Sequence, residues 1–166
     1  MTNGNPAVMG VRYASDKIQF LEMDTGISDP YTIFSSLYST RSFGLLFGGD
    51  NVGSTPRLVV NTNGLNPYLN ATDNMGTTST DNTVDSVVTL FSAENGGTAV
   101  LRKNGTQIDS LTRADDEIRP LGFLFRHQSN VLNKGLFFDS FIVYGSDKTS
   151  DFTDIEDQLK LANNIS

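Results

Sequence analysis

Short apolar runs recur along the chain between clusters of turn-forming residues, and this pattern predicts a series of strands. Many short strands separated by Gly, Asn, Asp and Pro are typical of β-sandwiches and barrels. The runs are Ala7–Met9, Lys17–Met23, Tyr31–Tyr38, Ser42–Gly49, Arg57–Asn61, Val84–Ser92, Ala99–Lys103, Thr106–Asp109, Leu121–Arg126 and Leu136–Tyr144. The last run is the most hydrophobic and is expected to be central in its sheet. The polar stretch 61–82 is expected to be a long loop with one short strand near Tyr68 and Leu69.

Two local patterns add detail. Asn104-Gly105 separates two strand-like runs and predicts a hairpin, because a type I′ turn needs positive φ at both central residues. Near the C-terminus, Phe152, Ile155, Leu159 and Ala162 recur at helical spacing and predict one amphipathic helix.

The start of this helix also has a sequence signature. Ser150 or Thr153 is expected to cap it, and Thr153 to Glu156 matches a capping box. We expect the helix to plug one end or edge of a sandwich.

Composition narrows the class of protein. The 166 residues fit one domain, and the absence of Cys excludes a disulfide scaffold, a thiolate metal site and a cysteine nucleophile. The net charge of -7 disfavours nucleic acid and anionic membrane surfaces as partners. No signal peptide or long apolar run is present, so we expect synthesis and assembly in a cytoplasm.

The order of these segments resembles concanavalin A-like lectin/glucanase domains, the laminin G-like sandwiches. The matching stretches are Asn3-Gly-Asn-Pro-Ala-Val8, Tyr31-Thr-Ile-Phe34, the hairpin Leu101-Arg-Lys-Asn-Gly-Thr106, the strand 135–144, and the later Ser150, Ile155, Glu156 and Leu159. The similarity spans nearly the whole chain. It implies a single domain, residues 1–166, that is all-β: a two-sheet antiparallel jelly-roll sandwich with one short C-terminal helix.

The residues do not favour an enzyme. The glucanase branch of the resembled family carries Glu-x-Asp-x-x-Glu, whereas Glu22-Met-Asp24-Thr-Gly-Ile27 has Ile in place of the second Glu. Because glycoside hydrolysis needs two carboxylates facing one bond, we predict no catalytic residues. His127 is the only His and has no Gly-x-Ser-x-Gly elbow to serve.

Carbohydrate binding is one candidate site chemistry, since an aromatic ring can pack on the apolar face of a sugar. Tyr68, with Asn66 and Asn70 beside it as hydrogen-bonding amides, is the best candidate. Tyr13 and Tyr38 are further candidate rings. The alternative is that these tyrosines are half-buried strand residues without a ligand.

Calcium is the one cofactor considered, because relatives of this fold often hold it with loop carboxylates. Asp73, Asp81 and Asp85 offer oxygen ligands within one loop region, and Asp115-Asp116-Glu117 forms a second acidic cluster. The alternative is that these are solvated loop acids.

Two functions remain open. The first is a non-enzymatic decoration or surface subunit of a bacteriophage virion, assembled in the host cytoplasm and contacting other subunits or further copies of itself. The second is a carbohydrate-binding module of a larger surface or secreted protein, located outside the cell. The two can coexist, and a glycoside hydrolase is less favoured. Neither function involves nucleic acid or a membrane.

Overall fold

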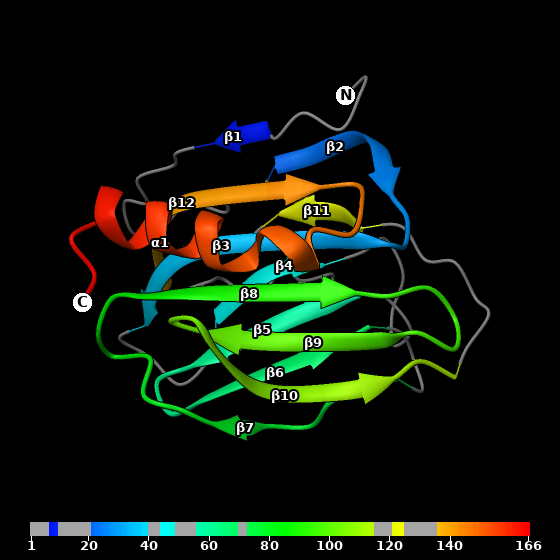
Figure 1. The fold of residues 1–166 in the computed structure, drawn as a ribbon, viewed down its shortest axis with the longest axis horizontal. Helices are drawn as coiled ribbons and strands as arrows, with labels where there is room; N and C mark the ends of the chain where they lie inside the picture. The colour runs from blue at the N-terminus through cyan, green and yellow to red at the C-terminus, as the bar shows by residue number, and fades with distance from the viewer. Residues whose placement is uncertain are drawn as a thin grey trace.

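A computed structural model of the chain describes residues 7–9, 21–39, 44–48, 56–69, 73–114, 121–124 and 136–166. These residues form two six-stranded antiparallel sheets that pack face to face, with one C-terminal helix (Figure 1). The predicted all-β sandwich with a single short helix is therefore confirmed.

Each sheet combines strands that are distant in the sequence. Sheet A has the order β1 (Ala7–Met9), β12 (Leu136–Tyr144), β3 (Tyr31–Ser39), β8 (Ser86–Ser92), β9 (Thr98–Lys103) and β10 (Thr106–Thr112). Sheet B has the order β2 (Leu21–Ile27), β11 (Leu121–Leu124), β4 (Gly44–Gly48), β5 (Arg57–Asn61), β6 (Gly64–Tyr68) and β7 (Thr78–Ser79).

The strand predictions hold with two corrections of placement. β5 and β12 have the predicted bounds, but β12 lies next to the edge strand β1, and β3 and β8 occupy the middle of sheet A. Every residue of β8 is buried, and so is every residue of β3 except the half-buried Tyr38, because these strands are covered on both faces. The second strand runs over Leu21–Ile27, later than predicted, and residues 17–20 lie outside the described part.

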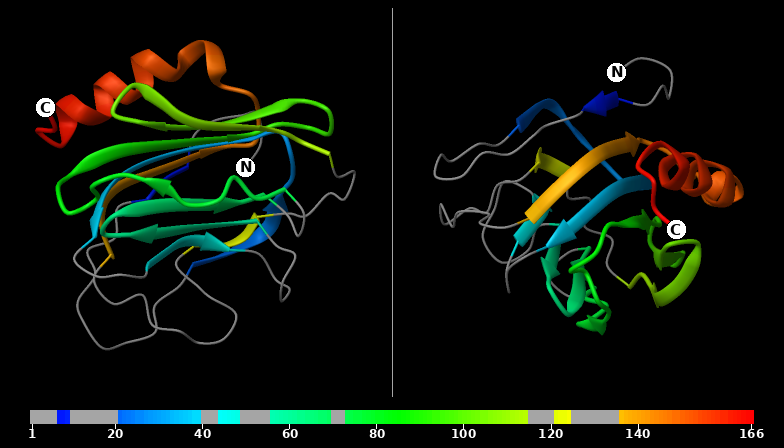
Figure 2. Two further views of the ribbon diagram at one scale, coloured as in Figure 1. Left: turned by 90° about the horizontal axis from the view of Figure 1, so that it is seen from below. Right: turned by 90° about the vertical axis from the view of Figure 1, so that its left-hand side faces the viewer.

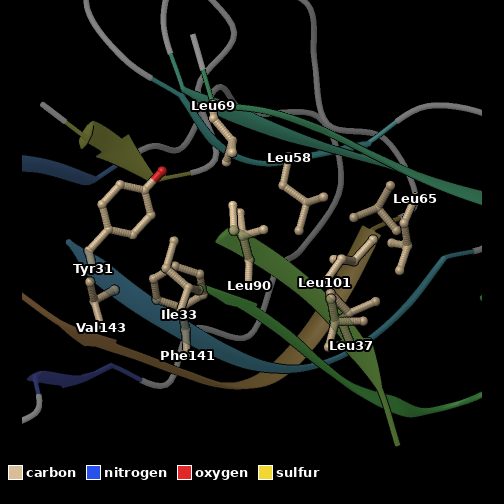
Figure 3. Packing of buried hydrophobic residues seen from close by; sticks show 13 residues of the cluster. Tyr31, Ile33, Leu37, Leu58, Leu65, Leu69, Leu90, Leu101, Phe141 and Val143 are labelled. Atoms are coloured by element: carbon tan, nitrogen blue, oxygen red, sulfur yellow. The ribbon is translucent and has the colours of Figure 1, made fainter. Parts of the chain in front are cut away.

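The stretch 61–82 contains the short strand predicted near Tyr68, but this strand is longer than expected and a further strand follows it, so the prediction of a long loop is wrong. β6 pairs with β5 from Gly64 to Tyr68, and β7 pairs with β6. Leu65 and Leu69 point into the core and are fully buried, as Figure 3 shows. A period-two burial pattern therefore runs through a segment whose Asn and Pro content suggested a loop.

The main core fills the space between the two sheets (Figure 3). Sheet A supplies Tyr31, Ile33, Leu37, Val88, Leu90, Ala99, Leu101, Phe141 and Val143, and the segment 58–69 supplies Leu58, Val60, Leu65 and Leu69. Burying each large aliphatic side chain stabilises the fold by roughly 1.5–3 kcal/mol.

The predicted hairpin is confirmed at Asn104 and Gly105, whose φ angles are 48° and 89°. Positive φ at both central residues is the requirement of the type I′ turn. The side chain of Asn104 adds a second function, because its Oδ1 accepts a 2.8 Å hydrogen bond from the amide of Val87. The turn is thereby fixed to the neighbouring strand β8.

The C-terminal helix α1 (Phe152–Ala162) follows a 3-10 turn, η1 (Thr149–Asp151). It lies along the outer face of sheet A rather than at an end or edge of the sandwich (Figure 2). Phe152 and Leu159 are buried there against Phe34, Val87 and Phe91 of the sheet. Ala162, expected on this buried face, is exposed. All helices in the described part are too short or too polar to traverse a lipid bilayer.

The predicted capping box is wrong. The N-cap residue is Asp151, so Thr153 already lies inside the helix. Asp151 makes no side-chain capping bond. Glu156 instead forms a two-point ion pair with Arg102 of β9, with Nε–Oε1 at 2.9 Å and Nη2–Oε2 at 3.1 Å. Since the Glu156 side chain is only 1% exposed, this pair fixes the helix to the sheet at a desolvated point.

Candidate functional site

The outer face of β5 and β6 carries the polar side chains that the sequence singled out. In β5, Leu58 and Val60 enter the core, so Arg57 and Asn61 point to the opposite side of sheet B. In β6, the buried positions alternate with the half-buried Asn66 and Tyr68. We call Arg57, Asn61, Asn66, Tyr68 and the adjacent Thr77 the polar face.

Strand pairing brings the polar face together. Arg57 is directly opposite Tyr68 in the β5–β6 ladder, and its guanidinium carbon lies 4.0 Å from the centroid of the Tyr68 ring. The Asn66 side-chain amide donates to Tyr68 Oη and to Thr77 Oγ1, both at 3.1 Å. Tyr68 is thus held by a cation on its ring and a donor on its hydroxyl.

Three polar atoms of this face are buried and have no hydrogen-bond partner: Arg57 Nε, Asn61 Oδ1 and Asn66 Oδ1. A buried donor or acceptor without a partner costs about 1–3 kcal/mol. Because these three atoms are buried, a ligand could bond to them only after the side chains around them move.

The structure describes some of the candidate residues from the sequence and not others. It brings Tyr68 and Asn66 together, whereas Asn70 lies outside the described residues. Tyr38 lies in β3 of the other sheet and is half-buried. Tyr13, His127 and the acidic cluster 115–117 are also outside the described residues.

Asp73, proposed as a calcium ligand, is instead part of a buried arginine cluster. Arg113 binds Asp73 Oδ2 through Nε at 3.0 Å and Asp29 Oδ2 through Nη1 at 2.6 Å. Nη1 also donates to Ser92 Oγ and the Ala93 carbonyl, both at 2.9 Å. Burial alone would lower the pKa of Arg113, but the hydrogen bond and charge of Asp29, with the hydrogen bond of Asp73, outweigh it and raise that pKa. Asp73 is therefore a structural counterion.

Asp81 and Asp85 do not join Asp73 in a metal site. Asp81 Oδ1 accepts bonds from the Thr83 amide at 2.9 Å and the Thr83 hydroxyl at 2.6 Å, which lower the pKa of Asp81. Asp85 is exposed. Within the described ranges, no three His, Cys, Asp or Glu residues are grouped so that they could hold a metal ion.

Sequence reasoning missed Arg57 and Thr77. Arg57 was recognised only as the first residue of a strand, because nothing local indicates that Tyr68 lies across from it. The available signal was its charge at an outward position of an otherwise apolar strand.

Comparison with known proteins identifies the fold alone. No protein-family model matches the chain, and no curated protein does either. Many solved structures match, including the binding domain of botulinum neurotoxin DC in complex with SialylT. That match has a TM-score of 0.63 and 12% identity, and covers 98% of this chain and 46% of that one.

Two other matches have the same character. The same toxin domain in complex with rat synaptotagmin II matches with a TM-score of 0.63 and 12% identity, over 99% of this chain and 47% of that one. Trypanosoma rangeli sialidase in complex with 2,3-difluorosialic acid matches with a TM-score of 0.55 and 13% identity, over 73% and 21%. The chain thus spans less than half of the toxin domain and about a fifth of the sialidase. These likenesses are to β-sandwich domains.

Proposed function

We propose that this protein is a non-catalytic binding module that takes a saccharide on the polar face of sheet B. The observation that carries the proposal is the half-buried Tyr68 ring on the outer face of sheet B, with the Arg57 guanidinium carbon 4.0 Å from its centroid and the Asn66 amide donating to its hydroxyl. Sugars present hydroxyl donors and acceptors around an apolar ring face. An amphipathic aromatic side chain with nearby amides complements both features.

The arrangement is preorganised for such a ligand. The Asn66 amide nitrogen donates to both Tyr68 and Thr77, which holds this side chain next to the Tyr68 hydroxyl. Arg57 and Tyr68 stack, which limits the freedom of both side chains before binding. Less conformational entropy is then lost when the ligand binds.

The structural neighbours support a binding role. One neighbour is a toxin binding domain in complex with SialylT, and the same kind of domain occurs with rat synaptotagmin II. Together with the segment order of the sequence, the two-sheet architecture also supports placing this sandwich among the concanavalin A-like domains. That placement is part of the proposal.

The test is glycan-array screening followed by calorimetry on the best neutral or charged oligosaccharide. Tyr68→Ala and Asn66→Ala are each expected to weaken binding by about tenfold or more, the equivalent of removing one hydrogen bond or one ring–sugar contact. Asn63→Ala is the matched control, because Asn63 is exposed in the turn between β5 and β6. Absence of saccharide binding by the folded protein, or binding unchanged in both variants, would overturn the proposal.

The bacteriophage virion role, with assembly in the host cytoplasm and other virion subunits as partners, stays a prediction from the sequence. A virion subunit is expected to form a stable oligomer or to bind purified phage particles. Light scattering of the purified chain, alone and with particles, checks this independently of saccharide binding.

A further inference from the structure

Arg57 is the only charged residue in β5, β6 and β7. The whole chain carries 19 acidic and 12 basic residues and is therefore negative overall, whereas the single charge on these three strands is positive. The polar face therefore has a local charge opposite in sign to that of the protein.

Arg57 also differs from the other described cations in its partners. Arg102, Arg113, Lys148 and Lys160 are in ion pairs with carboxylates. Lys103 bonds to Thr80, Asn82 and the Asp81 carbonyl. Arg57 takes part in none of the ion pairs among the described residues, and its Nε has no acceptor. Its one described contact is the ring of Tyr68.

From this contrast we infer that the saccharide bound on the polar face carries an anionic group, which Arg57 binds. The inference rests on the proposed function and names its ligand class. A guanidinium presents donors in a planar fork that matches a carboxylate or sulfate with two parallel hydrogen bonds. Because Nε is buried, the anionic group would bind the terminal Nη1 and Nη2 of Arg57 and supply the counter-charge that this residue lacks.

The net charge limits how many anionic groups the ligand carries. At physiological ionic strength a charge is felt over roughly 8 Å, so Arg57 acts locally while the rest of the protein repels anions. The site accordingly suits an oligosaccharide with a single carboxylate or sulfate at its end, and a polyanionic chain is disfavoured.

The experiment measures the affinity of matched saccharides for the full chain by calorimetry. The probes are lactose, sialyllactose, sulfated lactose and a glucuronate-terminated disaccharide, so that carboxylate and sulfate are distinguished. We expect the wild-type protein to bind at least one anionic probe about tenfold or more tightly than lactose. Arg57→Gln should remove this preference, so that the anionic probes bind no more tightly than lactose does, while Arg57→Lys should keep only part of it.

The outcomes separate this inference from the proposed function. If lactose binds, depends on Tyr68, and binds as tightly as every anionic probe, the inference fails and the proposed function stands. An anionic preference that survives in Arg57→Gln also overturns the inference. If no saccharide binds the folded protein, both fail. Circular dichroism and urea unfolding of each variant confirm that a lost preference does not reflect a lost fold.

Discussion

The outer face of sheet A and the polar face of sheet B each place an arginine against an aromatic ring. The two arginines differ in whether a carboxylate of the protein pairs with the guanidinium. Arg102 of β9 lies 5.0 Å from the Phe152 ring and pairs through two hydrogen bonds with Glu156 of α1. Arg57 of β5 lies 4.0 Å from the Tyr68 ring and has no carboxylate partner among the described residues.

The difference lies in charge pairing: Arg102 is paired with a carboxylate inside the fold, whereas Arg57 is not paired with one among the described residues. On sheet A the chain supplies its own helix to cover the surface, and the covered charges are satisfied within the protein. On the polar face Arg57 has no carboxylate partner among the described residues, and one donor and two acceptors are buried without hydrogen bonds. Ser36 and Thr89, on the covered face of sheet A, also have unpartnered hydroxyls, so the unpaired cation is what distinguishes the polar face.

The largest expected loss of stability is for a substitution of Arg113. Its ion pairs are buried, so it shows what the loss of a structural arginine costs. Arg113→Met should destabilise the protein by about 3–5 kcal/mol, because it leaves the carboxylates of Asp29 and Asp73 buried without a counterion. Urea unfolding measures the loss. Adding Asp73→Asn to this variant should recover part of it, since one uncompensated charge is then removed. A loss below about 1 kcal/mol would contradict the structural role.

The second effect concerns the covered face. Glu156→Ala should lower stability by about 2 kcal/mol, less than for a fully buried pair because Arg102 is 17% exposed and can partly hydrate. The matched control is Asp157→Ala, which breaks an exposed pair with Lys160 and should cost at most about 0.5 kcal/mol. Equal losses in the two variants would show that the Arg102–Glu156 pair does not fix the helix.

Tyr31 lies in the core between the two faces, and its hydroxyl is buried there. Burial, and to a smaller extent the charge of Asp29, raises the pKa of Tyr31 above its usual value of 10.0. Below pH 10 the hydroxyl is neutral in both states, and the stability tied to this shift is fully present. As the pH rises above 10 only the unfolded state ionises, so stability falls by about 1.4 kcal/mol per pH unit from this group.

Comparing wild type with Tyr31→Phe isolates this contribution. The free energies of unfolding in urea should keep a constant difference up to about pH 10 and then converge or cross in favour of Tyr31→Phe at higher pH. A difference that stays constant up to about pH 11 would mean that Tyr31 ionises in the folded protein.

The smallest expected effect on stability is at Arg57. Arg57→Gln should change the free energy of unfolding by no more than about 1 kcal/mol, because stacking on the Tyr68 ring is a weak interaction and the substitution also removes an unpartnered donor. A loss as large as that of Arg113→Met would assign Arg57 to the fold and remove the contrast between the two faces.

The parts of the fold that could be predicted from the sequence are those with local causes. The Asn104-Gly105 turn follows from the φ angles that only a few residues tolerate, and β5 and β12 follow from short apolar runs. The helix followed from the spacing of Phe152, Ile155 and Leu159, although its cap did not. The β6 strand was predicted only near Tyr68, because Asn66 and Pro67 signal a loop and the rest of the segment becomes a strand through pairing with β5.

The site could be predicted only in part, for the same reason. Tyr68 and Asn66 lie two residues apart on one face of a strand, so their proximity is visible in the sequence. The partner of Asp73 is 40 residues away and that of Glu156 is 54 residues away, so neither ion pair has a local signal. Arg57 becomes a candidate only once the strand register places it opposite Tyr68.

The measurement that tests the central claim most directly is a titration of the labelled protein with sialyllactose, followed by backbone amide and Asn and Arg side-chain chemical shifts in solution. The account predicts that the shifts concentrate on β5, β6 and residues 74–79, include the side chains of Arg57 and Asn66, and are lost in Tyr68→Ala. Shifts centred on α1 and the outer face of sheet A, or no shifts at all, would contradict it.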